Sequence, residues 1–73
     1  MFRGMDLYQV LLEVGDHHYL FDVATPDYDA VELAKIWLLE HRGIDTGKVP
    51  VHVGGYSMVG QADKSSVELI HES

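Results

Sequence analysis

The chain has 73 residues, which is enough for one small domain spanning residues 1–73 with a single layered core. It contains no cysteine, which excludes disulfide bonds and any thiolate ligand or nucleophile. Five Lys and Arg against twelve Asp and Glu give a formal net charge of −7, and the basic residues are scattered singly. This charge argues against direct binding to nucleic acid or to an anionic membrane surface.

The N-terminal third of the chain predicts a β-hairpin. Residues 1–5 are expected to be a loose end without the apolar core of a signal peptide. Residues 6–14 and 18–24 then alternate between apolar and polar side chains, and Gly15 with Asp16 forms a turn pair between them. Tyr19, Phe21 and Val23 are expected on the side that packs against the rest of the core.

Residues 25–43 predict one helix with both ends marked in the sequence. Thr25 is expected to cap the N-terminus and Pro26 to take the first helical position. His41 and Arg42 suit the last turn, and Gly43 suits the left-handed C-terminal cap. The side chains expected on the buried face of this helix are those of Ala30, Val31, Ala34, Trp37, Leu38 and His41.

Two further strands are expected after the helix. Alternation runs from Val49 to Val53, the pair at 54–55 indicates a bulge, and residues 56–59 could continue the strand. Pro50 predicts an edge strand, or one whose regular pairing begins only after the proline. Residues 60–65 read as a loop and residues 67–72 as the last strand.

These elements predict an α+β domain with ββαββ order. We expect a four-stranded, mainly antiparallel sheet, built as two hairpins that flank the helix, with the helix packed on one face. The strand order is not readable from the sequence, and a mixed sheet stays open if the helix joins parallel neighbours.

Such a fold leaves one face of the sheet without a covering layer. Alternation places on it Leu7, Gln9, Leu11, Glu13, His18, Leu20, Asp22, His52, Glu68, Ile70 and Glu72. An apolar centre with a charged rim is typical of protein interfaces. The predicted partner-binding residues are Leu7, Leu11, Glu13, Leu20, Asp22, Glu68 and Ile70, with Leu33 and Ile36 of the helix as secondary candidates. The alternative is that these aliphatic residues reflect β-propensity alone.

No pattern in the sequence points to catalysis. The five histidines lack metal-binding spacing, and adjacent residues such as His17 and His18 point to opposite faces of a strand. The sequence therefore predicts no catalytic residue, no metal and no cofactor.

The sequence favours a non-enzymatic, acidic protein-interaction module located in the cytoplasm. Its partner would be a basic or nucleic-acid-binding protein that it could inhibit, and self-association into a homodimer is a further expectation. In size and element order the chain resembles small bacterial and phage accessory proteins, although this likeness covers no motif. The alternatives are a structural subunit of a larger assembly and, less favoured, a metal- or ligand-binding domain that uses His17, His18 and His52.

Overall fold

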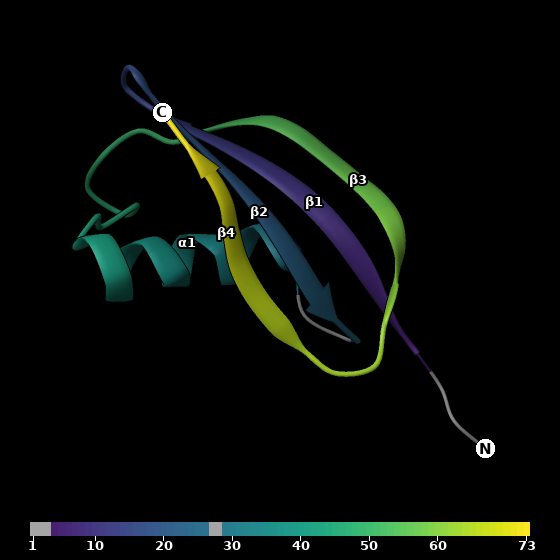
Figure 1. Cartoon of the computed structure of the whole chain (residues 1–73). Helices are drawn as coiled ribbons and strands as arrows, with labels where there is room; N and C mark the ends of the chain where they lie inside the picture. The colour runs from purple at the N-terminus through teal and green to yellow at the C-terminus, as the bar shows by residue number, and fades with distance from the viewer. Residues whose placement is uncertain (1–3, 27–28) are drawn as a thin grey trace.

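The computed structural model describes residues 4–26 and 29–73, which form one sheet and one helix (Figure 1). The elements are β1 (Met5–Val14), β2 (His17–Thr25), α1 (Ala30–Arg42), β3 (His52–Ala62) and β4 (Ser66–Glu72). All strand pairs are antiparallel, and the strand order is β3-β1-β2-β4. The predicted α+β fold with ββαββ order is confirmed.

The hairpin of β1 and β2 forms the centre of the sheet. Its two-residue connection begins with Gly15, whose φ of 61° lies in the left-handed region that glycine adopts at little cost. The pairing is regular from Val14 opposite His17 to Asp6 opposite Thr25. The first strand therefore begins at Met5, inside the segment that was expected to be a loose end. Residues 1–3 of that segment lie outside the described residues.

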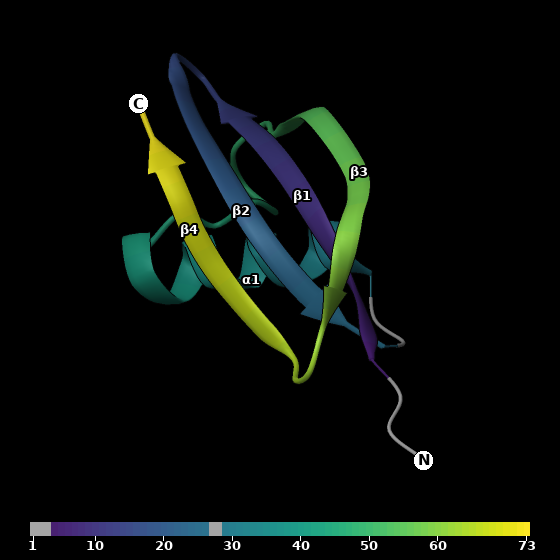
Figure 2. The same cartoon turned by 45° about the vertical axis from the view of Figure 1, so that its right-hand side comes forward.

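The expectation of a second hairpin is wrong, because β3 and β4 lie at opposite edges of the sheet. Only residues 63–65 connect these two strands. The four Cα–Cα steps of this connection span at most about 15 Å. In a flat sheet, the two edges would be separated by three strand spacings of about 4.8 Å each, or about 14 Å in total. The edges must therefore converge at this end of the sheet, as Figures 1 and 2 both show.

The core lies between one face of the sheet and α1. Its buried side chains are those of Val10, Leu12, Tyr19, Phe21, Val23, Ala30, Ala34 and Leu38. The small side chains of Ala30 and Ala34 let the helix approach the sheet closely. Phe21 contacts Trp37 edge to face, with a distance of 5.4 Å between ring centroids, an arrangement that aromatic pairs favour.

The helix begins later than the sequence predicted. Thr25 is not its cap, because this residue is buried and pairs with Asp6 as the last residue of β2. Asp29 takes the capping role instead, and its Oδ1 accepts a hydrogen bond of 2.9 Å from the backbone N–H of Val31. Residues 27 and 28, which fall within the predicted helix, lie outside the described residues.

The predicted C-terminal end of the helix is confirmed. Gly43 has a φ of 68°, and its N–H donates to the carbonyl of Leu39. The Gly43 bond is the one expected of an αL ending, and the N–H of Ile44 also donates to the carbonyl of Leu38.

Bulges interrupt both edge strands. The third strand begins at His52, after Pro50, and Gly54 is the extra residue between the pairs Leu11–Gly55 and Leu12–Val53. A Cβ at Gly54 would lie 2.6 Å from Oε2 of Glu13, so a side chain at this position would displace the Glu13 carboxylate. The predicted bulge at this place is confirmed.

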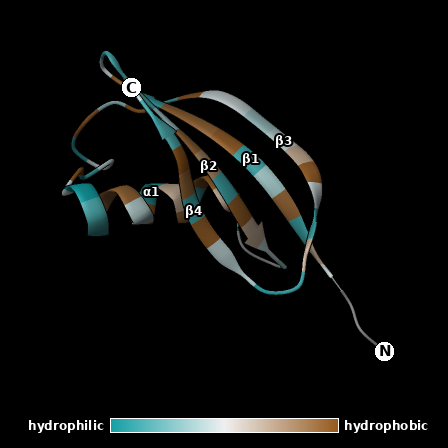
Figure 3. Ribbon diagram, in the orientation of Figure 1, coloured by the Kyte–Doolittle hydropathy of each residue, from teal (hydrophilic) through white to brown (hydrophobic). Residues whose placement is uncertain are grey.

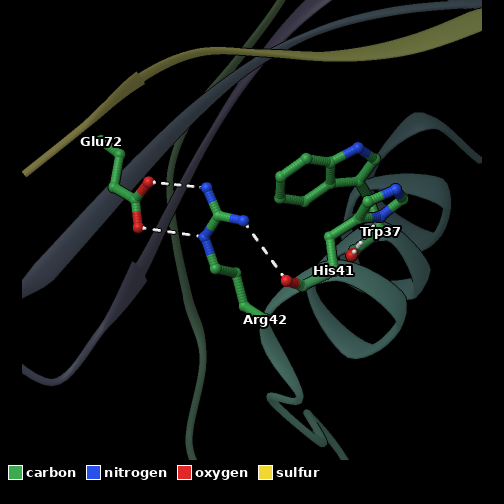
Figure 4. A network of polar contacts seen from close by, with 4 residues as sticks. All are labelled: Trp37, His41, Arg42 and Glu72. Atoms are coloured by element: carbon green, nitrogen blue, oxygen red, sulfur yellow. Dashed lines mark hydrogen bonds and ion pairs between the residues drawn. The ribbon is translucent and has the colours of Figure 1, made fainter.

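The bulge in β4 was not expected, and it corrects the placement of Glu72. Ile70 is the extra residue between the pairs Phe21–Leu69 and Leu20–His71, so the alternation changes phase there. Glu72 consequently lies on the helix side, where its carboxylate accepts two hydrogen bonds from Arg42, of 3.0 and 3.3 Å (Figure 4). The Arg42 guanidinium also lies 5.1 Å from the ring centroid of Trp37.

Candidate protein-interaction site

The candidate site is the face of the sheet turned away from α1, which we call the outer face. Figure 2 shows this face towards the viewer, with the helix behind the strands. Because side chains alternate along a strand, the neighbours of the core residues in β1 and β2 lie here. The register places the predicted site residues of these strands, Leu7, Leu11, Glu13, Leu20 and Asp22, on this face.

The centre of the outer face is aliphatic. Leu11 and Leu20 lie directly opposite each other on the two central strands, and both are half-buried. On the far side of Leu20, the bulge in β4 sets Ile70 beside His71, and Ile70 is 47% exposed. Leu7 lies further along β1, opposite Ala24. The structure thus brings Leu11, Leu20 and Ile70 together across three strands, with Leu7 on the same face.

Two carboxylates lie next to this aliphatic centre. Asp22 on β2 is directly opposite Glu68 on β4, with Gln9 on its other side. Like charges in directly opposed positions destabilise a sheet. The Oδ1 atom of Asp22 is also buried and has no hydrogen-bond partner among the described residues. A hydrogen-bond donor from another molecule would satisfy this oxygen.

The third acidic residue, Glu13, lies at the opposite end of the face between two histidines. The register places His18 on one side of Glu13 and His52 on the other. Nε2 of His18 is 3.8 Å from Oε2 of Glu13. In residues 4–26 and 29–73, no group of three or more His, Asp or Glu side chains is arranged to hold a metal ion.

The two secondary candidates on α1 differ from each other. Leu33 is half-buried and packs against the core, so its position has a structural explanation. Ile36 is 44% exposed and points away from the sheet.

Sequence reasoning missed a second apolar surface, on the helix side of β3. The helix packs over β1, β2 and β4, and it leaves Val53, Tyr56 and Met58 exposed. Figure 3 shows β3 white to brown over most of its length. Tyr56 stacks on Tyr8 with 5.3 Å between ring centroids, and burial raises the pKa of the Tyr8 phenol. The strand order, which sets β3 at the edge beyond the helix, could not be read from the sequence, so this surface was not predicted.

A pocket of about 320 Å³ opens where the end of β2, the helix and the start of β4 meet. Its lining side chains are apolar or bear hydroxyl groups, and they belong to Ala24, Thr25, Pro26, Leu33, Ser65, Ser66 and Val67. It therefore offers no acid–base pair from these residues.

Comparisons with known proteins add no functional information. A scan against protein-family models and searches of curated proteins and of solved structures found no match. Within the described part of the chain, no helix is long and apolar enough to cross a membrane.

Proposed function

We propose that the protein is a non-enzymatic interaction module whose outer face binds a partner protein. The observation that carries this proposal is the juxtaposition of an aliphatic centre, formed by Leu11, Leu20 and Ile70, with the opposed carboxylates of Asp22 and Glu68. The helix packs on the other side of the sheet, so it does not cover these groups. Binding would bury the aliphatic side chains and supply donors to the carboxylates.

The charge of the face indicates a basic partner. Glu13, Asp22 and Glu68 contribute acidic groups, whereas the lysines and arginines of the described residues lie on α1 and in the connections between elements. The whole chain carries a formal charge of −7, which would steer a basic surface towards it. An arginine of the partner would match the carboxylates best, because its guanidinium can donate to two oxygens at once.

A protein that normally binds nucleic acid presents such a surface. An acidic module docked there would occupy the positions of phosphate groups and would exclude the nucleic acid. In this form of the proposal the protein is an inhibitor, and its binding weakens as the salt concentration rises.

Affinity capture with matched variants tests the proposal. The native chain, the double variant Leu11→Glu with Leu20→Glu, and Ile36→Glu would be immobilised and exposed to cell extract. The double variant places charge in the aliphatic centre, whereas Ile36→Glu places charge on an exposed apolar position of α1. We expect the native chain and Ile36→Glu to retain the same partner protein, and the folded double variant not to retain it. Raising the salt concentration should release the partner from the native chain.

The opposite pattern would contradict the proposal. A partner that binds the folded double variant as well as the native chain would exclude the outer face. Retention that does not change with salt would exclude the basic partner.

A further inference from the structure

We propose that two copies of this chain associate through the free edges of β3. In this arrangement the two β3 strands pair in antiparallel orientation about a two-fold axis near Ser57. The two four-stranded sheets then form one continuous sheet with both helices on the same face. The inference concerns a different surface from the outer face and does not depend on it.

The edge formed by β3 lacks the charged residues and prolines that protect many natural edges, and its two bulges leave residues 55–58 regular. Residues 52–62 include no Asp, Glu, Lys, Arg or Pro. The other edge strand, β4, is shorter and carries Glu68 and Glu72. Charged residues, prolines, short length and bulges all protect natural edges, and of the two edge strands β3 is the longer and uncharged one.

The charges of the pairing strands do not oppose a second copy at this edge. Two chains with a formal charge of −7 each repel one another over most approaches. The strand β3 has no acidic residue, so two copies that meet edge to edge along it bring no carboxylates of the pairing strands into opposition.

The side chains of β3 add an apolar contact to the backbone pairing. On the helix side of the sheet, Tyr56 is 51% exposed and Met58 is 61% exposed. Directly opposed residues of an antiparallel pair must point to the same face. A register centred on Ser57 satisfies this condition and sets Tyr56 of each copy beside Met58 of the other. Contact between a methionine sulfur and an aromatic ring is favourable.

The same register also matches the length and shape of the strand. Ser57 is the midpoint of β3, so His52 of one copy lies opposite Ala62 of the other. The bulges at Gly54 and Val59 lie on either side of the midpoint, and residues 55–58 between them pair regularly with β1. This regular stretch is the part of the edge that can continue the sheet.

Sedimentation equilibrium of the native 73-residue chain and two variants tests the association. Met58→Glu places like charges near each other across the proposed interface, and Ile36→Glu adds the same charge on α1 as a control. We expect the native chain and Ile36→Glu to have twice the 8.2 kDa mass of one chain. For Met58→Glu we expect the dissociation constant of the dimer to rise about tenfold or more. A native chain that stays monomeric, or a dimer that Met58→Glu leaves unchanged, would overturn the proposal.

Cross-linking tests the register and does not rely on a destabilising variant. Because the native chain has no cysteine, Ser57→Cys introduces a single thiol at the proposed two-fold axis. Opposed residues of antiparallel strands have Cα atoms about 4.5–5.5 Å apart, which suits a disulfide. Under mild oxidation we expect a covalent dimer from Ser57→Cys and little from Ser65→Cys, in the exposed connection between β3 and β4. Equal cross-linking of the two variants, or none from Ser57→Cys, would overturn the register that places Ser57 at the two-fold axis.

Discussion

Asp22 lies in the middle of the outer face, with Glu68 directly opposite and one carboxylate oxygen that has no partner within the described residues. An asparagine or a threonine at this position would avoid the repulsion between opposed carboxylates. Groups that cost folding free energy and recover it on binding are typical of functional surfaces. Asp22 and Glu68 are therefore the residues whose positions most directly indicate a binding surface.

We expect Asp22→Asn to raise the free energy of unfolding by about 0.2–1 kcal/mol, because it removes one charge from an opposed pair of carboxylates. Glu68→Gln should raise it by a similar amount for the same reason. The two gains should not add in the double variant, because either change alone relieves the shared repulsion. Urea unfolding of the four proteins measures this coupling. Fully additive gains, or a loss of stability from both single changes, would show that the pair does not strain the sheet.

Between elements, the end of α1 is tied to the end of β4 by Arg42 and Glu72. Hydrogen bonding to the Arg42 guanidinium holds the pKa of the Glu72 carboxyl below its ordinary value. The same bond raises the pKa of Arg42, which stays charged at any ordinary pH. Glu72 therefore stabilises the folded chain when it is ionised, and this contribution is lost as the pH falls through its lowered pKa.

We expect Glu72→Gln to melt at a lower temperature than the native chain at neutral pH. The difference should persist down to the ordinary pKa of a glutamate and should disappear at more acidic pH, where Glu72 of the native chain is protonated. Thermal melts across this pH range measure the effect, and Glu40→Gln, at an exposed position of α1, is the matched control. A difference that is the same at every pH would show that the ion pair is not its cause.

The order of the elements could be predicted from local patterns, whereas their pairing could not. Gly15 and Gly43 mark a turn and a helix end by backbone conformation alone, so the sequence located both. The choice between Thr25 and Asp29 as the helix cap depended on how far β2 pairs with β1, which is a tertiary property. The bulge at Ile70 contains no glycine, so the sequence pattern did not indicate it. The predicted faces of the side chains that follow Ile70 in β4 were consequently wrong.

At the scale of the whole molecule, the single helix is too small to cover the sheet. It packs over β1, β2 and β4 and leaves β3 with exposed aromatic and aliphatic side chains on the helix side. The outer face has no second layer within the described residues. A 73-residue chain without disulfides gains little stability from so small a core, and burial against other molecules is the remaining way to add to it.

The two proposed surfaces are compatible with each other. Pairing through β3 leaves the outer faces of both copies open and on the same side of the continuous sheet. A dimer built in this way would present two binding faces, and a partner with repeated sites would bind it more tightly than it binds one copy.

The most direct measurement of the central claim is methyl NMR of the native chain during titration with the captured partner. We expect the methyl signals of Leu11, Leu20 and Ile70 to shift together as the partner is added, because these groups form the centre of the outer face. The signals of Ile36 and Leu39, exposed on α1, should stay in place. Shifts confined to the helix methyl groups, with Leu11 and Leu20 unchanged, would contradict the account.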